Sequence, residues 1–549
     1  MTLFILTSMK SLHWGERGVL MYLLIALSAI IAPFIFLVLL RFPATKGMTW
    51  SALIVILFAI TVWGMEGEVI LSSIFQGTHK TLTILWILFG ALVLLNTLRN
   101  TGAVDRINQG FQSISADMRV QVIIVAFLFG ALIEGAAGFG TPAMVTGPLL
   151  VALGFRPLAA ATIAVVADSA SVAFGAVGTP IAVGLSNVPI ANATFYDEIG
   201  IMVTTLDLFA GTFIPFVLVI LLTIFFGKNK SIKQALPMLP WSLLIGLSYT
   251  GSALFYAVVF GQEFVAILAS LTALVIATLT AKKGWLLPKD TWREAVREGF
   301  VVKEKKSEMG IIAAWAPYVV VVVLLLMTRI IPWLTEFTQS AIDLSWTNIL
   351  GVEGVSSTWE FLYSPGTILA VAAVLSVFLH KKSFHTFVNA SKESLSTMKT
   401  TSISLIATLA MVHVFTNSGI NLNELASMPQ YIAESLANSL GFIWLIVAPF
   451  LGELGSFITG SATVSTLTFS PIQYSVANQI GLDVNAVLAA QVIGAGAGNM
   501  ICVHNVVAAS AVVGLSGKEG DIIRKTLLPA ILYGLIVGIV GFIIAHFFL

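Results

Sequence analysis

Apolar segments long enough to cross a lipid bilayer recur along the whole chain. The hydrocarbon core of a membrane takes about 20 helical residues to span. The clearest segments lie at 18–40, 81–98, 201–226, 263–281, 311–333, 366–379, 400–416 and 527–548, and shorter or interrupted ones at 49–64, 120–133, 157–184, 240–260, 437–454 and 484–513. Only 10% of the 549 residues are charged, against about a quarter in soluble domains. We predict an all-α polytopic membrane protein, a single transmembrane domain over 1–549 with about 12 to 14 transmembrane helices.

The sequence argues against several other classes of protein. The net charge of +1 indicates no nucleic-acid partner, and the single cysteine, Cys502, excludes an intramolecular disulfide framework and a multi-cysteine metal site. The sequence contains no H-E-x-x-H zinc motif, nucleophile elbow or P-loop. We therefore expect a transporter that is not an enzyme and that uses no cofactor and no metal ion. No cleavable signal peptide is expected in the first 17 residues, and a surface amphipathic helix is expected at 282–310.

The basic residues are distributed unequally between alternate loops. Positive charge marks the cytoplasmic side of a membrane protein, and 23 of the 28 Lys and Arg residues fall in or next to one alternating set of loops. The other set, at 186–200, 334–365 and 418–440, contains no Lys or Arg but several acids. This asymmetry predicts a multi-pass protein of the cell membrane (plasma or inner) with both termini outside.

Two regions interrupt the apolar pattern with glycines and prolines. In the first, at 120–186, an apolar run reaches L-I-E-G-A-A-G-F-G-T-P, and F-G-A-V-G-T-P follows. In the second, at 441–514, I-T-G-S-A-T is followed by G-A-G-A-G-N-M. The loop charges make the two regions cross the membrane in opposite directions. Together with the similar pattern, this predicts two inverted-topology repeats containing broken helices or re-entrant hairpins, a design that binds substrate near the midplane.

The breaks are predicted to bind an anionic substrate. Irregular backbone at membrane depth lines a cavity or is buried in protein, and the N-terminus of a half-helix attracts anions. Thr141 and Ser461 can cap the next half-helix and donate a hydroxyl group, although tight helix packing is the alternative role for small residues. The candidate substrate-binding residues are Gly138, Gly140, Thr141, Gly178, Thr179, Gly460, Ser461, Thr463, Asn499, His504 and Asn505.

Ionisable residues in the apolar regions are candidates for proton coupling, because a charge inside the bilayer is costly and usually functional. The candidate proton-coupling acids are Glu134, Asp168 and Glu453. The alternatives are a hydrogen-bonded interior acid or a glutamate near the interface. His504 is also a candidate proton relay, whereas Arg156 is expected to reach the cytoplasmic interface.

The motifs resemble those of the L-lactate permease family. In the first half, I-L-F-G-A-L-V-L-L-N, I-E-G-A-A-G-F-G-T-P-A and V-A-F-G-A-V-G-T-P-I carry the resemblance. In the second half, a G-S-x-T-x-S element, G-N-M-I and V-G-L-x-G-K-E-G follow in the same order. The resemblance covers most of the chain, from about residue 10 to 548.

This resemblance implies uptake of L-lactate, D-lactate and glycolate, small 2-hydroxymonocarboxylates, coupled to protons. It also implies that the substrate lies at Gly138–Pro142 and Gly460–Ser465. The family pattern has Asp where this chain has Ala462 and Lys where it has Asn499, which suggests a different charge layout. A sodium-coupled carboxylate transporter is the alternative, because unwound backbone carbonyls can bind Na⁺. The expected partners are substrate, protons and lipid, and no oligomeric state is indicated.

Overall fold

The computed structural model describes residues 14–138, 140–300, 309–440 and 443–547. Within these residues the chain is helical, with three isolated β-bridges as the only β pairing. Ten helices or helix runs are long and apolar enough to cross a membrane, or twelve if two sharply bent pairs each count as one span, and three shorter apolar helices accompany them. The predicted all-helical membrane fold is confirmed, and the larger count meets the lower end of the expected range.

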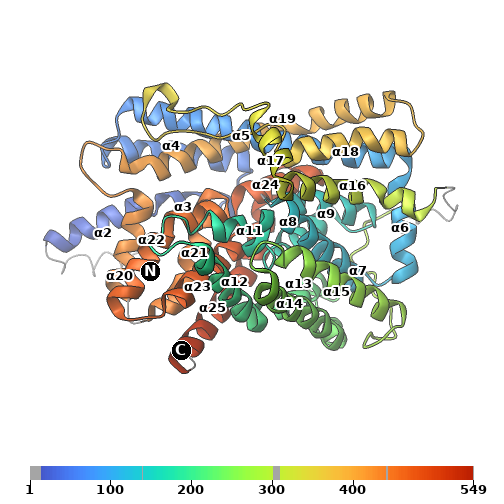
Figure 1. Cartoon of the computed structure of the whole chain (residues 1–549). Helices are drawn as coiled ribbons and strands as arrows, with labels where there is room; N and C mark the ends of the chain where they lie inside the picture. The colour runs from blue at the N-terminus through green and yellow to red at the C-terminus, as the bar shows by residue number, and fades with distance from the viewer. Residues whose placement is uncertain (1–13, 139, 301–308, 441–442, 548–549) are drawn as a thin grey trace.

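Four helices pack together along one side of the molecule (Figure 1). They are α4 (Ala44–Thr61), α5 (Gly67–Thr101), α18 (Pro365–Leu379) and α19 (His385–Thr416). Glycines allow their close approach. A Cβ added at Gly77 would lie 2.5 Å from the Leu409 backbone, and one at Gly90 would lie 2.3 Å from the Gly366 carbonyl oxygen. A larger residue at either crossing would push the helices apart.

A second group of helices packs along the opposite side (Figure 1). It consists of α12 (Ala193–Ala210), α13 (Ile214–Phe226), α14 (Leu239–Phe260), α15 (Val265–Lys282) and α25 (Glu519–Phe547). Polar contacts join these helices where they cross. The hydroxyl oxygens of Thr212 and Thr250 lie 2.6 Å apart, and the Trp241 indole donates a 3.0 Å hydrogen bond to the Thr280 hydroxyl.

The two regions singled out in the sequence lie between these groups (Figure 1). The first contains η3 (Val122–Phe129), α8 (Gly130–Ala137), α9 (Thr141–Ala152), α10 (Pro157–Ala167), η4 (Val172–Phe174) and α11 (Gly175–Ala182). The second contains α21 (Trp444–Thr459), α22 (Ala462–Ile480), α23 (Val484–Gly498) and α24 (Val503–Val512). Each region contains a hairpin of two helices followed by two helical segments that a break separates; that the two regions are inverted repeats stays a prediction.

The remaining helices surround these three parts. They are α2 (Trp14–Ala26), α3 (Ser28–Pro33), η2 (Phe34–Leu39), α6 (Ala103–Ile114), α7 (Met118–Gln121), α16 (Ile311–Ile330), α17 (Pro332–Ser340) and α20 (Met428–Leu440), with short turns η5 (Gly211–Phe213), η6 (Ile232–Gln234), η7 (Leu236–Met238), η8 (Ile349–Gly351) and η9 (Asn417–Gly419). The apolar windows of Met118–Ala136 and Val484–Val512 are entirely buried, whereas only 33% of the apolar window of α25 is buried. The two broken regions are therefore enclosed by protein rather than by lipid.

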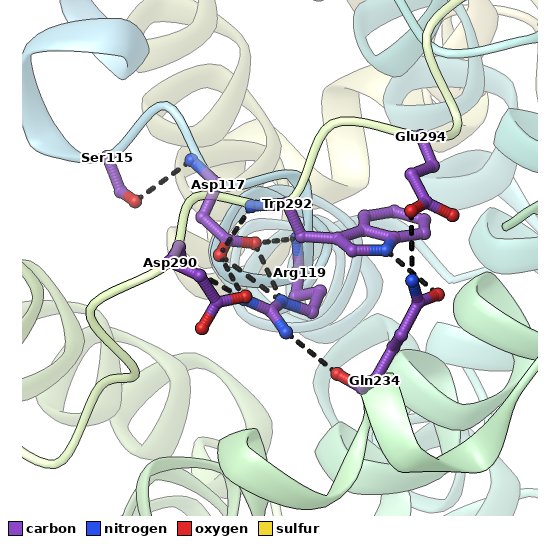
Figure 2. Close-up of polar contacts among 7 residues, drawn as sticks. All are labelled: Ser115, Asp117, Arg119, Gln234, Asp290, Trp292 and Glu294. Atoms are coloured by element: carbon purple, nitrogen blue, oxygen red, sulfur yellow. Dashed lines mark hydrogen bonds and ion pairs between the residues drawn. The ribbon is translucent and has the colours of Figure 1, made fainter. Parts of the chain in front are cut away.

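A buried arginine clasp holds the start of the first region (Figure 2). Arg119, 1% exposed, places Nη2 2.6 Å from Asp117 Oδ2 and 3.1 Å from Asp290 Oδ2. Its Nη1 donates to the Gln234 carbonyl oxygen at 2.7 Å, and the Trp292 backbone N–H donates to Asp117 Oδ2 at 3.1 Å. These contacts bring three segments that are distant in the sequence together at one point.

The segment 283–300 is not the amphipathic helix expected from the sequence; it consists of turns and bends. Some of its backbone groups pair with the first region. The Met118 N–H donates to the Trp292 carbonyl oxygen at 3.0 Å, and the Arg297 N–H donates to the Gly154 carbonyl oxygen at 2.8 Å. Residues 301–308 lie outside the described residues, as do the first 13, to which the signal-peptide expectation mainly applies.

Helix α5 begins fourteen residues before the predicted span at 81–98. Polar side chains in this extra length find tertiary partners. Gln76 Nε2 donates to the Ser356 carbonyl oxygen at 2.7 Å, and His79 Nδ1 lies 2.9 Å from Ser357 Oγ. Lys80, one residue before the predicted span, therefore lies within the helix.

Candidate functional site

Two hairpin turns form where the backbone adopts conformations that suit glycine. Gly138 (φ 64°) ends α8 and Gly140 (φ 72°) begins α9. Gly460 (φ 71°) ends α21, and the Ser461 hydroxyl caps α22 by accepting a 3.3 Å hydrogen bond from the Val464 N–H. We call residues 138, 140 and 141 the first hairpin turn and residues 460–462 the second hairpin turn.

Two helix breaks accompany the hairpin turns. The first helix break, residues 168–178, separates α10 from the end of α11, and the second, residues 499–502, separates α23 from α24. In the first break Ala176 (φ 44°) and Val177 (φ 57°) take left-handed conformations. This conformation costs a residue with a side chain about 1–2 kcal/mol, and such strain is concentrated at functional sites.

Both hairpin turns contact the first turn of α24. A Cβ added at Gly140 would lie 2.5 Å from Asn505 Oδ1, and one at Gly460 would lie 1.6 Å from His504 Nδ1. His504 and Asn505 are adjacent and buried. The two regions of the sequence therefore meet at a single half-helix N-terminus.

The first helix break joins the same cluster. A Cβ added at Gly138 would lie 2.9 Å from the Ala176 Cβ. Val172, Ala462 and Ala495 form a small buried apolar cluster, which connects the first break to the second hairpin turn and to α23. Ala462 therefore packs against apolar side chains.

Two of the three predicted acids lie together. Glu134 on α8 and Asp168 at the end of α10 are 2% and 3% exposed, and their carboxyl groups are within hydrogen-bonding reach of each other. A Cβ added at Gly175 would lie 2.3 Å from Glu134 Oε1. Two adjacent carboxyl groups in a low-dielectric interior cannot both ionise unless a cation lies with them.

Glu453, the third predicted acid, lies apart from this pair. It is buried on α21 and faces α25, where a Cβ added at Gly534 would lie 2.1 Å from Glu453 Oε1. The absence of a side chain at Gly534 makes room for the carboxyl group. The structure thus separates the acids of the two regions.

The predicted hydroxyl ligands differ in their surroundings. The Thr179 hydroxyl donates to the Ala176 carbonyl oxygen at 2.6 Å, and Thr463 is half-buried. Ser461 caps α22 as predicted, but Thr141 is not a cap, because the left-handed Gly140 takes that position. Thr141 Oγ1 is buried and has no hydrogen-bond partner, so its hydroxyl is free to bind a ligand.

Unpaired polar atoms are concentrated in the two broken regions. Among the described residues, fifteen buried side-chain oxygen or nitrogen atoms have no hydrogen-bond partner. Nine belong to these regions: Glu134, Thr141, Asp168, Glu453, Ser456, Thr466, Asn499, Asn505 and Ser510. Buried polar atoms are normally hydrogen-bonded, so this concentration indicates a place where a ligand, ion or water completes the bonding.

Three residues near the acid pair were missed in the sequence. Asp207 on α12 is 5% exposed and accepts a hydrogen bond from the Tyr533 hydroxyl on α25. Tyr249 on α14 lies within electrostatic reach of Asp207, Asp168 and Glu134. An acid inside the apolar segment 201–226 was the signal that could have identified Asp207.

Lys80 was also missed, because it borders the predicted span at 81–98. It is half-buried and lies within electrostatic reach of His413 on α19 and His504 on α24. Arg156 lies elsewhere. Its guanidinium group faces backbone carbonyls, and Nη2 donates to the Glu294 carbonyl oxygen at 3.2 Å. Arg156 is therefore no part of this cluster.

Comparison with known proteins identifies the family. The model of the L-lactate permease family matches residues 22–548. The L-lactate permease of Bacillus subtilis (strain 168) is 31% identical over 574 residues, which cover 96% of this chain and 97% of that protein. The glycolate permease GlcA of Escherichia coli (strain K12) is 29% identical, covering 96% of each chain. This chain belongs to the L-lactate permease family.

Proposed function

We propose that the protein takes up L-lactate and related small 2-hydroxymonocarboxylates, D-lactate and glycolate, by proton symport. The convergence of both hairpin turns on His504 and Asn505 carries this proposal, because it brings buried polar groups from the two regions together among membrane helices. The names of the related permeases supply the substrate class.

The substrate carboxylate is proposed to bind at the half-helix N-termini of α9, α22 and α24. Free backbone N–H groups at such ends carry roughly half a positive charge. Thr141 Oγ1, Asn499 Oδ1 and Asn505 Oδ1 lack hydrogen-bond partners. The Thr141 hydroxyl can donate to the substrate, and the two amide oxygens can accept a hydrogen bond from its 2-hydroxyl group. Gly138, Gly140, Gly178 and Gly460 would let the backbone approach these groups closely.

The acid pair Glu134 and Asp168 is proposed to carry the coupled proton. A proton shared by the two carboxyl groups removes the cost of burying two charges. Binding of the proton and the substrate would then precede movement of the two broken regions, which we propose to be inverted repeats, relative to the helix groups beside them. We propose the cell membrane as its site, with both termini outside.

Uptake into proteoliposomes tests the proposal. The purified protein should accumulate L-lactate, D-lactate and glycolate when the exterior is acidic, and a protonophore should abolish the accumulation. Empty liposomes provide the background. Failure to transport any of the three acids under an imposed pH gradient would contradict the proposed function.

Sodium coupling is the second candidate, and the acid pair itself motivates it. Glu134 Oε2 and Asp168 Oδ1 are both unpaired, and carboxylate oxygens also bind small hard cations. Uptake is therefore measured under two conditions. In one, Na⁺ is removed while the pH gradient is kept; in the other, the pH gradient is collapsed while Na⁺ is kept. Accumulation that follows only the Na⁺ gradient would replace the proton in the mechanism.

A further inference from the structure

The Lys80 side chain places an ammonium group among the membrane helices without an anionic partner in the described residues. Lys80 lies thirteen residues after the start of α5 (Gly67–Thr101), and its side chain is half-buried. Its neighbours Gln76 and His79 hydrogen-bond to the loop at 356–357. Within the described residues, Lys80 makes no hydrogen bond or ion pair, and no carboxylate acts on it electrostatically.

The titratable groups near Lys80 are imidazoles rather than acids. Lys80 is within electrostatic reach of His413 and His504, neither of which can neutralise an ammonium group. Withdrawing a cation from water without a partner is costly. A fixed cation in this position is therefore suited to an anion that arrives from outside the chain.

Lys80 lies within electrostatic reach of His504, at the half-helix end that both hairpin turns contact. His504 adjoins Gly460, and Asn505 adjoins Gly140. The helix that carries Lys80, α5, packs against both α9 and α24. The N-terminus of α24 adds its own partial positive charge at this point.

We propose that Lys80 is the cation that binds the carboxylate of the substrate, together with the N-terminus of α24. This rests on the proposed function, and it adds the residue that selects a singly charged carboxylate over a neutral analogue. The unpaired Asn505 Oδ1 and Thr141 Oγ1 then bind the 2-hydroxyl group. One ammonium group matches one carboxylate, in agreement with a monocarboxylate substrate.

Lactamide, the neutral amide of lactate, provides the test. Titration calorimetry on the purified full-length protein should show L-lactate binding more tightly than lactamide by about tenfold or more, since a charge-assisted hydrogen bond contributes at least that factor. Lys80→Gln should weaken L-lactate binding about tenfold and leave lactamide nearly unchanged. Lys80→Arg should keep part of the preference for the charged ligand.

The control is Lys282→Gln, the same charge removal at an exposed lysine on α15, which should leave both affinities unchanged. Elution volume and thermal midpoint establish that each variant is folded. A folded Lys80→Gln protein that keeps the lactate-to-lactamide ratio overturns the inference. If that variant does not fold, the wild-type protein provides the test: an equal wild-type affinity for L-lactate and lactamide overturns the inference. A wild type that binds neither lactate nor glycolate contradicts the proposed function instead.

Discussion

At the scale of single residues, Glu134 and Asp168 form a buried pair of acids in the first broken region. Each is an acid that a membrane helix would normally exclude, and burial beside the other acid makes their joint ionisation unfavourable. The sequence identified both residues by type and position. Their pairing depends on the bend between α10 and α11, which is 61° and is not visible in the sequence.

Replacing Glu134 tests the proton role directly. Glu134→Gln removes one of the two proton-binding groups, so we expect pH-driven accumulation of L-lactate to be lost in proteoliposomes. Exchange of lactate at equal pH should persist, because it needs no net proton movement. Glu336→Gln, at an exposed glutamate, should behave as wild type. Full accumulation by Glu134→Gln that a protonophore still abolishes would exclude Glu134 as the carrier.

Replacing Thr141 tests the substrate contact. Its hydroxyl has no partner within the protein, so Thr141→Ala should leave the thermal midpoint nearly unchanged while weakening lactate binding by about 1 kcal/mol, or roughly fivefold. Thr146, on the same helix, donates instead to the Pro142 carbonyl oxygen at 2.9 Å. Thr146→Ala should therefore keep wild-type affinity. Calorimetric titration separates the two variants, and equal affinity of Thr141→Ala and wild type would remove Thr141 from the site.

At the scale of secondary-structure elements, the hairpin turns and helix breaks position the candidate site residues. The two hairpin turns and the two helix breaks could be located from Gly and Pro patterns because these residues act locally, through φ and through missing hydrogen-bond donors. Thr141 was wrongly expected to cap α9, since Gly140 in a left-handed conformation takes the capping position. Local pattern therefore predicts where a helix stops, whereas the neighbouring backbone decides which residue completes the turn.

Two glycines that end successive helices provide a matched test of the second hairpin turn. Gly460 (φ 71°) and Gly481 (φ 70°) have nearly equal backbone conformations, so alanine strains both by about 1 kcal/mol. A Cβ at Gly460 would collide with His504 Nδ1, while a Cβ at Gly481 meets nothing within 4 Å. Gly460→Ala should therefore lose lactate binding at least about tenfold and Gly481→Ala should not. Equal affinities in a calorimetric titration would show that His504 is not at the site.

The arginine clasp connects distant segments at the scale of the whole molecule (Figure 2). Its ion pair is almost completely buried, with side-chain exposures of 1% for Arg119 and 8% for Asp117. The loop containing Asp290 and Trp292 is held to the first region by this pair instead of folding as a helix. The position of that loop was unpredictable, because it depends on side chains more than a hundred residues apart.

Removing the clasp should destabilise the protein. Arg119→Met leaves Asp117 buried without its partner, which typically costs about 3–5 kcal/mol. The matched control is Lys518→Met, which breaks a 4.0 Å pair with Asp521 at a largely exposed lysine and should cost less than about 1 kcal/mol. Denaturant unfolding followed by tryptophan fluorescence gives both values. A cost for Arg119→Met no larger than for Lys518→Met would contradict the clasp.

The sequence by itself determined the membrane class, the family resemblance, the two broken regions and most of the candidate residues. These features depend on composition, on hydrophobic segment length and on residues that act on their own backbone. Only the tertiary structure decided which of those residues meet: Glu134 with Asp168 but not with Glu453, and both hairpin turns with one end of α24. It also placed Lys80 within electrostatic reach of His504 and Asp207 near the same tyrosine as the acid pair. Such long-range placement depends on how helices pack, and no local pattern records that packing.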